Sequence, residues 1–185
     1  QNFFTDPEVG QNNFGALKIS VVGAYSYNAD RYYSFLEDEM EKFGALVRGA
    51  GRLVGFGINS YDIPVLTHYF TRSKGCEDID LWQKERVDLL SESEAGTGER
   101  ISLSKLAEAN LGVSKNHHGS AAIAMYREGK IEELKEYCVN DVRLTKELYD
   151  IWKEGKLVVP EKKTGVLVSV GIKSPAENSN RNTLF

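Results

Sequence analysis

The sequence predicts a single α/β domain in which strands come early and helices lie between and after them. Short apolar segments rich in β-branched residues predict strands at residues 16–25, 31–36 and 52–56. Apolar residues spaced by three and four predict helices, the longest over about residues 130–153. This order of elements favours helices packed on a sheet of mixed direction.

Composition sets limits on the class of protein. The chain has 185 residues, of which 27% are charged and 41% hydrophobic, with a formal net charge of -4. We therefore expect one domain over residues 1–171 and a disordered polar tail over residues 172–185. The charge gives no overall basic field, so a nucleic-acid partner would have to be held by a local patch or by bound cations.

Cysteine usage and apolar run length indicate the compartment. Cys76 and Cys138 are far apart in the sequence and belong to no Cys-x-x-Cys arrangement, so we expect free thiols in a reducing environment. The longest apolar runs have strand length, which predicts neither a signal peptide nor a transmembrane span. The expectation is a soluble cytoplasmic protein with no membrane partner.

The remaining elements follow from capping and turn residues. Asn28 to Asp30 predict a hairpin turn, Ser102 predicts a helix N-cap, and Gly112 predicts a helix end. The segment 91–100, rich in Ser, Glu and Gly, is expected to be a mobile loop. Further helices are predicted at residues 37–47, 65–70, 83–90, 103–110 and 120–127, and further strands at 157–159 and 166–170.

The long helix near the C-terminus carries an acidic residue in an apolar stripe. A carboxylate at Asp141 is costly there unless it is paired, hydrogen-bonded or bound to a metal ion. Tyr137 lies one turn earlier and points into the same space. The alternative is a core aspartate that accepts a hydrogen bond beside an ordinary packing tyrosine. The stripe consists of Ile131, Leu134, Cys138, Asp141, Thr145, Leu148 and Trp152.

A second acidic residue follows a predicted strand. The strand at 52–56 ends in a turn over residues 57–61, which delivers Asp62 directly before Ile63 and Pro64. Loops at strand ends are where sites are commonly built. Taken alone, Asp62 before a helical proline is also typical of a helix N-cap.

Two segments taken together resemble motifs of the DEDD 3'-5' exonuclease superfamily. Residues 55–66, Gly-Phe-Gly-Ile-Asn-Ser-Tyr-Asp-Ile-Pro-Val-Leu, are similar to its second motif, and residues 137–145, Tyr-Cys-Val-Asn-Asp-Val-Arg-Leu-Thr, to its third. The likeness is closest to stand-alone and helicase-associated members with a Tyr in the last motif. It extends to the proofreading domains of family B DNA polymerases.

The resemblance implies a ribonuclease-H-like mixed sheet flanked by helices and a specific chemistry. Members hydrolyse nucleic-acid phosphodiester bonds from a 3' end with two divalent cations, Mg²⁺ or Mn²⁺. Asp62 and Asp141 would be metal ligands, and Tyr137 would orient the attacking water. Asn59 and Lys115 are candidate contacts to the nucleic acid. The implied partner is a single-stranded DNA or RNA 3' end, as in DNA repair.

Two departures from the family pattern leave an alternative open. Gly57 stands where members usually carry an Asn, and we expect the Asp-x-Glu of the first motif upstream of Gln1, with Asp6 and Glu8 as the other candidates. The alternative function is a catalytically incomplete nucleic-acid-binding or scaffolding module. The apolar pair at residues 184–185, Leu184 and Phe185, is either accidental or an anchor for a replication or repair protein.

Overall fold

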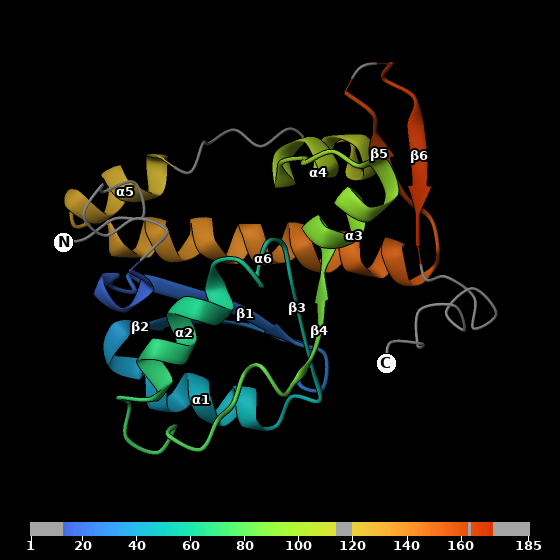
Figure 1. Cartoon of the computed structure of the whole chain (residues 1–185). Coiled ribbons are helices and arrows are strands. Elements are labelled where there is room, and N and C mark those ends of the chain that lie inside the picture. The colour runs from blue at the N-terminus through green and yellow to red at the C-terminus, as the bar shows by residue number, and fades with distance from the viewer. Residues whose placement is uncertain (1–12, 114–119, 163, 172–185) are drawn as a thin grey trace. The chain divides into compact units, whose positions relative to one another are not determined.

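The computed structural model describes residues 13–113, 120–162 and 164–171. The chain divides into two compact units (Figure 1). The first unit comprises residues 1–88 and 117–143, and the second comprises residues 89–116 and 144–185. The expected segments at 115–119 and 173–185 lie outside the described residues. None of the helices in the described part of the chain is long and apolar enough to cross a membrane.

The first unit contains strands and helices in alternation. A short 3-10 helix, Glu37–Glu39, leads into α1, and a further 3-10 helix covers Phe14–Ala16. The predicted strand at 16–25 therefore begins later, at Val21. The longer elements are β1 Val21–Ser26, β2 Arg31–Leu36, α1 Met40–Arg48, β3 Arg52–Gly55, α2 Asp62–Phe70, β4 Glu85–Asp88, α5 Ser120–Arg127 and the first part of α6 Ile131–Lys153.

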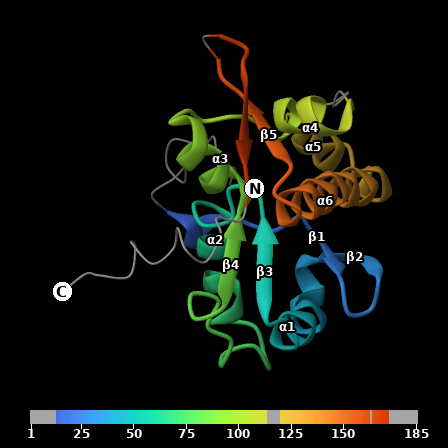
Figure 2. The ribbon, with the colours of Figure 1, turned by 90° about the vertical axis from the view of Figure 1, so that its right-hand side faces the viewer.

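The strands of this unit pair in two different ways. β1 and β2 form the predicted antiparallel hairpin, with Val21 opposite Leu36 and Ser26 opposite Arg31. β3 and β4 run parallel, with Gly55 opposite Asp88 at their carboxyl ends (Figure 2). The α/β class is confirmed. The expected single mixed sheet is seen instead as separate two-stranded sheets among the described residues.

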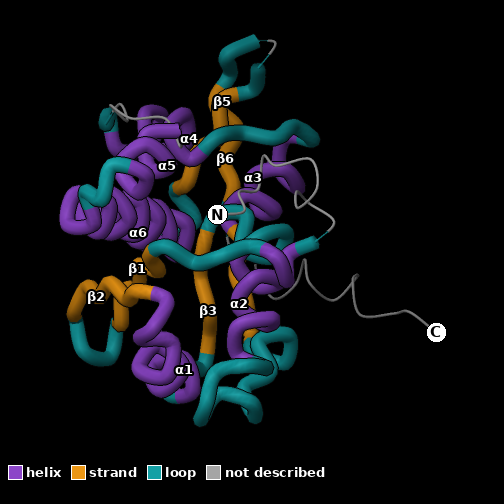
Figure 3. The backbone as a smooth tube through the Cα atoms, turned by 90° about the vertical axis from the view of Figure 1, so that its left-hand side faces the viewer, coloured by secondary structure: helices purple, strands orange, loops and turns teal. Residues whose placement is uncertain are grey.

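A contiguous apolar core joins α1 and α2 to the strands. The rings of Phe35, Phe43 and Phe70 are in contact, with centroids 5.3 Å and 5.8 Å apart in that order. Figure 3 shows α1 and α2 beside β3. Burial of such side chains is the main favourable term in folding. Its buried members are Leu17, Ile19, Phe35, Met40, Phe43, Val47, Ile58, Ile63, Val65, Phe70, Cys76 and Leu81.

Gly23 lets α6 approach the hairpin closely. A Cβ atom at this position would lie 2.8 Å from Val142 Cγ2, 3.0 Å from Cys138 Sγ and 3.2 Å from the Cys138 carbonyl oxygen. Real side chains do not tolerate the shortest of these distances without a shift of the neighbour. Because Gly23 has no side chain, the helix that carries Asp141 packs closely against β1.

The second unit packs two short helices against an antiparallel ribbon. It contains α3 Leu89–Thr97, α4 Leu103–Leu111, the rest of α6, β5 Leu157–Pro160 and β6 Leu167–Val170. Ser102 Oγ caps α4 by accepting a hydrogen bond from the Lys105 amide, and Gly112 ends it with a φ of 67°. The Asn110 side-chain amide bonds both the N–H and the carbonyl of Val158 on β5. The predicted cap, stop and two strands are confirmed.

Two predictions in the middle of the chain are wrong. The expected helix at 83–90 is strand β4 followed by the start of α3, and the expected mobile loop at 91–100 is mostly helix α3. β4 exists because its backbone pairs with β3, which is distant in sequence. Ser93, buried completely, donates its hydroxyl to the Leu89 carbonyl and so is satisfied inside the helix. Long-range pairing and burial override the local pattern at both places.

Replacing Gly23 should loosen the contact between α6 and β1. We expect Gly23→Ala to lower the free energy of unfolding by about 1–3 kcal/mol, because the new methyl group overpacks Val142 and Cys138. Gly51→Ala is the matched control, since no atom lies within 4 Å of its added Cβ, and it should change stability by less than about 0.5 kcal/mol. Urea unfolding measures both. Equal stability of the two variants would contradict the close approach.

Candidate functional site

The site is built where two parallel strands end together. β3 ends at Gly55 and β4 ends at its partner Asp88. The chain after β3 turns over residues 57–60 and then enters α2 at Asp62. Carboxyl ends of parallel strands are a common location for binding sites in α/β folds. The arrangement brings the turn over residues 57–60 and the end of β4 side by side.

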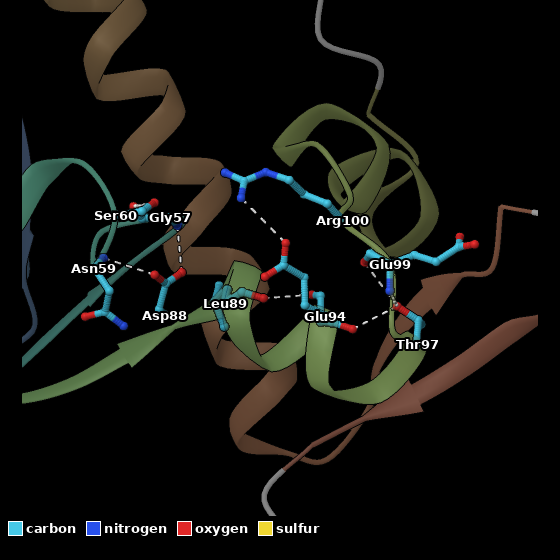
Figure 4. A network of polar contacts seen from close by, with 10 residues as sticks. Gly57, Asn59, Ser60, Asp88, Leu89, Glu94, Thr97, Glu99 and Arg100 are labelled. Carbon is cyan, nitrogen blue, oxygen red and sulfur yellow. Dashed lines mark hydrogen bonds and ion pairs between the residues drawn. The ribbon is translucent and has the colours of Figure 1, made fainter. Parts of the chain in front are cut away.

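The buried carboxylate of Asp88 holds this turn. Asp88 is 5% exposed, and its Oδ1 accepts a hydrogen bond of 2.6 Å from the Gly57 amide. Its Oδ2 accepts a second bond of 3.1 Å from the Asn59 amide (Figure 4). A buried carboxylate is costly unless hydrogen bonds replace its water, and these two bonds do so. Asp88 thereby fixes the backbone that leads to Asp62.

Gly57 explains one departure from the family pattern. Its φ is 76°, in the left-handed region that Gly adopts freely and that Asn tolerates better than most residues. A left-handed position of this kind accepts either Gly or Asn. The turn is also tight, because a Cβ at Gly55 would lie 1.9 Å from Ile58 Cγ2.

Asp62 is the first residue of α2, not its N-cap. The cap position is Tyr61, and no side chain there caps the helix. The capping interpretation of Asp62 is therefore wrong, and the carboxyl is available for another role. Pro64 is the third helical residue, where a missing backbone N–H costs nothing.

The electrostatic environment of Asp62 favours a bound proton. Burial among protein atoms, together with a smaller contribution from the negative charge of Asp88, raises the pKa of the Asp62 carboxyl from 3.8 to about 6. Burial also raises the pKa of the adjacent Tyr61 hydroxyl. As a residue Asp62 still keeps an exposed surface, so solvent screens part of the effect. The carboxyl is crowded by protein atoms and yet reachable from water.

Asn59 presents an oriented amide beside this carboxyl. Its side chain is exposed, and its Oδ1 accepts a hydrogen bond of 3.0 Å from Arg86 Nε. Because the Arg86 N–H can only donate, the oxygen of the amide must face Arg86. The Nδ2 group then faces away as a donor. The proposal that Asn59 contacts nucleic acid is compatible with this orientation.

Tyr137 and Asp141 lie on α6, the long helix that the sequence predicted over about residues 130–153. Tyr137 and Asp141 are half-buried, and the helix faces solvent through residues such as Glu136 and Asn140. The Oδ1 atom of Asp141 is buried and accepts no hydrogen bond from the described residues, although the residue makes other interactions. A buried carboxylate oxygen with remaining acceptor capacity is suited to a cation or a donor.

The described residues alone do not form a metal centre. No group of three or more His, Cys, Asp or Glu side chains in residues 13–113, 120–162 and 164–171 is arranged to hold a metal ion. Asp62, Asp88 and Asp141 therefore do not constitute a three-ligand set as they stand. Other predicted residues, namely Lys115, Asp6 and Glu8, lie outside the described residues. Cys76 and Cys138 are free thiols, as predicted.

Asp88 was missed from the sequence because β4 was predicted to be helical. A signal was present, since Val87-Asp88-Leu89-Leu90 places an acid within an apolar run. The same reasoning that singled out Asp62 after a strand would have singled out Asp88, had the strand been recognised.

Comparison with known families decides the classification. A family model described as the RNase H superfamily matches residues 11–153. The chain belongs to the RNase H superfamily. Searches of curated proteins and of solved structures returned no match. The expected ribonuclease-H-like fold is thus confirmed, whereas the exonuclease subtype stays a prediction.

Membership of the RNase H superfamily indicates the broad function. A domain of this superfamily points to nuclease-type processing of nucleic acid by hydrolysis, usually with divalent metal ions. The matched range contains Asp62, Asp88, Tyr137 and Asp141. A separate pocket in the second unit, between the start of α4 and the end of β5, is lined by none of these residues.

Removing the Asp88 charge should destabilise the turn. We expect Asp88→Asn to lower the free energy of unfolding by about 1–3 kcal/mol, because one oxygen cannot accept both amide bonds and a buried N–H loses its acceptor. Asp78→Asn is the control, since the Asp78 side chain is 72% exposed and its surface ion pair with Arg48 should contribute less than about 1 kcal/mol. Urea unfolding compares the variants. Equal losses would show that Asp88 does not hold the turn.

The raised pKa of Asp62 should make stability depend on pH. The folded state binds a proton at Asp62 more tightly than the unfolded state, so this contribution is fully present below pH 3.8 and is lost as pH rises toward about 6. We expect Asp62→Asn, which cannot ionise, to gain stability relative to the wild type across this window. Thermal unfolding at a series of pH values measures the difference. A difference that is constant with pH would refute the shifted pKa.

Proposed function

We propose that this RNase H superfamily chain is a metal-dependent 3'-5' exonuclease that hydrolyses nucleic-acid phosphodiester bonds. The observation that carries the proposal is the turn braced by Asp88, which sets the Asp62 carboxyl at the ends of two parallel strands. The similarity of residues 55–66 and 137–145 to motifs of the DEDD exonucleases supports the proposed 3'-5' polarity of cleavage. The proposed substrate is the 3' end of a single strand of DNA or RNA.

The chemistry assigns different tasks to the residues. Divalent Mg²⁺ or Mn²⁺ would supply charge stabilisation at the attacking and leaving oxygens of an in-line displacement. Asp62 and Asp141 are the proposed ligands from this chain, and the acidic pair of the first motif would complete the set. Tyr137 is proposed to orient the attacking water through its hydroxyl. Asn59, held by Arg86, is proposed to donate its amide to the substrate.

A second candidate function has its own support. A nucleic-acid-binding or scaffolding module of the same fold would need no complete metal centre. The absence of a three-ligand group among the described side chains favours this alternative. A role in DNA repair, and an anchor for a replication or repair protein at Leu184 and Phe185, are compatible with either function.

Loss of either proposed ligand should abolish cleavage. We expect Asp62→Ala and Asp141→Ala to lower kcat/KM on a single-stranded oligonucleotide about a hundredfold or more, since each removes a group that acts in the transition state. Glu136→Ala is the matched control, because Glu136 is exposed on the same helix. Chelator-resistant cleavage that survives in both aspartate variants would exclude the metal-dependent mechanism.

Tyr137→Phe should separate rate from affinity. Only the hydroxyl is lost, so kcat should fall while KM stays close to that of the wild type. Steady-state kinetics over a range of substrate concentrations measures both constants. A rise in KM without a change in kcat would mean that Tyr137 only packs or binds.

Metal titration distinguishes the two candidate functions. We expect the chain to bind at most one Mn²⁺ ion and to bind it weakly, because Asp62 and Asp141 supply only part of the ligand set. Calorimetric titration of the wild type against Asp62→Ala measures the number of sites. Two tight sites would show that this chain holds the first motif as well, with Asp6 and Glu8 as its acids. No heat in either protein would favour the binding module.

A further inference from the structure

The hairpin of the first unit carries a row of aromatic rings. Tyr25 and Tyr32 lie directly opposite each other on β1 and β2, with ring centroids 4.7 Å apart. Tyr27, in the turn, meets Tyr25 edge to face at 5.0 Å. Tyr27 is 46% exposed, so the outer end of the row is open to solvent. We refer to Tyr25, Tyr27 and Tyr32 together as the tyrosine row.

Arginine extends the row from α6. The guanidinium carbon of Arg143 lies 5.7 Å from the centroid of the Tyr32 ring, which is within the range of a cation–π contact. Arg143 is exposed, and among the described residues no carboxylate forms an ion pair with it. Its charge is therefore held beside the Tyr32 ring, and no carboxylate in the described part of the chain is paired with it.

The tyrosine row does not belong to the apolar core of the unit. Val22, Ala24 and Tyr33 lie on the opposite face of the hairpin and pack against that core. The row shares its face with Gly23, where α6 is seated. One acidic group, Asp30, lies at the tip of the hairpin, and it accepts a hydrogen bond from the Tyr25 hydroxyl. This contact orients the central ring of the row.

We propose that the tyrosine row and Arg143 form a binding surface for single-stranded nucleic acid. Exposed aromatic rings stack on bases of any sequence, and an adjacent arginine binds the phosphate backbone. The net charge of the chain is -4, so attraction of a polyanion requires local cations such as Arg143. The choice of nucleic acid as the partner rests on the proposed function, but binding at this surface requires neither metal nor cleavage.

Binding in the presence of chelator tests the surface separately from catalysis. The probe is a short fluorescent oligothymidylate, titrated in EDTA and followed by anisotropy. We expect Tyr27→Ala to weaken binding about tenfold through loss of stacking, and Tyr27→Phe to bind like the wild type. Leu167→Ala is the control, because Leu167 on β6 of the second unit is an apolar side chain that is 55% exposed, and it should change binding by less than about twofold.

Salt dependence isolates the contribution of Arg143. For single strands each phosphate contact contributes about 0.7 to the slope of log affinity against log salt, so Arg143→Gln should flatten the slope by about that amount. Tyr27→Ala should leave the slope unchanged. Arg52→Gln is the control for a cation, because Arg52 already pairs with Glu85 at 2.6 Å.

The outcomes separate this surface from the proposed catalytic function. Equal effects of Tyr27→Ala and Leu167→Ala on binding would overturn the proposed surface, as would a wild-type protein that does not bind the probe. Circular dichroism of each variant establishes that it is folded before binding is compared. Loss of cleavage in Asp62→Ala with unchanged binding in EDTA would support both proposals. If the wild type does not cleave the substrate but its binding still depends on Tyr27, the exonuclease proposal is refuted and the proposal of a binding surface stands.

Discussion

The hydrogen bonds from Gly57 and Asn59 to the buried Asp88 carboxylate are the interaction on which the site depends. They connect the end of β4 to the turn after β3, and the turn delivers Asp62 to the start of α2. Without an acceptor, the amides of this turn would be buried and unpaired, which is costly in a protein interior. Gly57, which donates the first of these bonds, also adopts a left-handed conformation in this turn.

The same interaction shapes the electrostatics of the site. Asp88 stays satisfied by donors, while its charge acts on Asp62 and adds to the effect of burial on the Asp62 pKa. Two carboxylates held close together favour a bound proton or a bound cation, because like charges repel. This is the expected character of a site in a superfamily that acts on phosphodiesters, usually with metal ions. Holding the Asp62 and Asp88 carboxyls near each other also lowers the stability of the fold, a cost that a purely structural aspartate would not carry.

The second constraint on the first unit is the close packing of α6 on the hairpin. Gly23 permits the approach, and Cys138 and Val142 occupy the space. Asp141 and Arg143 lie on the same helix as Cys138 and Val142. This contact therefore also fixes the direction in which the side chains of Asp141 and Arg143 point. Arg143 reaches Tyr32 on the hairpin, whereas Asp141 belongs to the half-buried stripe. One helix thus serves both the proposed catalytic residues and the proposed binding surface.

The sequence by itself determined the α/β class, the β1–β2 hairpin, the capped helix α4 and the long helix α6, and it singled out the segments around Asp62 and Asp141 as candidates. These features are encoded locally, in side-chain periodicity, turn residues and capping residues that act within a few positions. Only the tertiary structure decided that residues 85–88 form a strand, that residues 89–97 form a helix, and that Asp88 supports the turn at Gly57. The physical reason is that β4 has only four residues and gains its stability by pairing with β3, so no local window contains its partner. The same holds for Asp62: its role as a helix cap was a local interpretation, whereas its carboxyl pKa is raised by burial in the folded protein and, to a smaller extent, by Asp88 from a distant part of the chain.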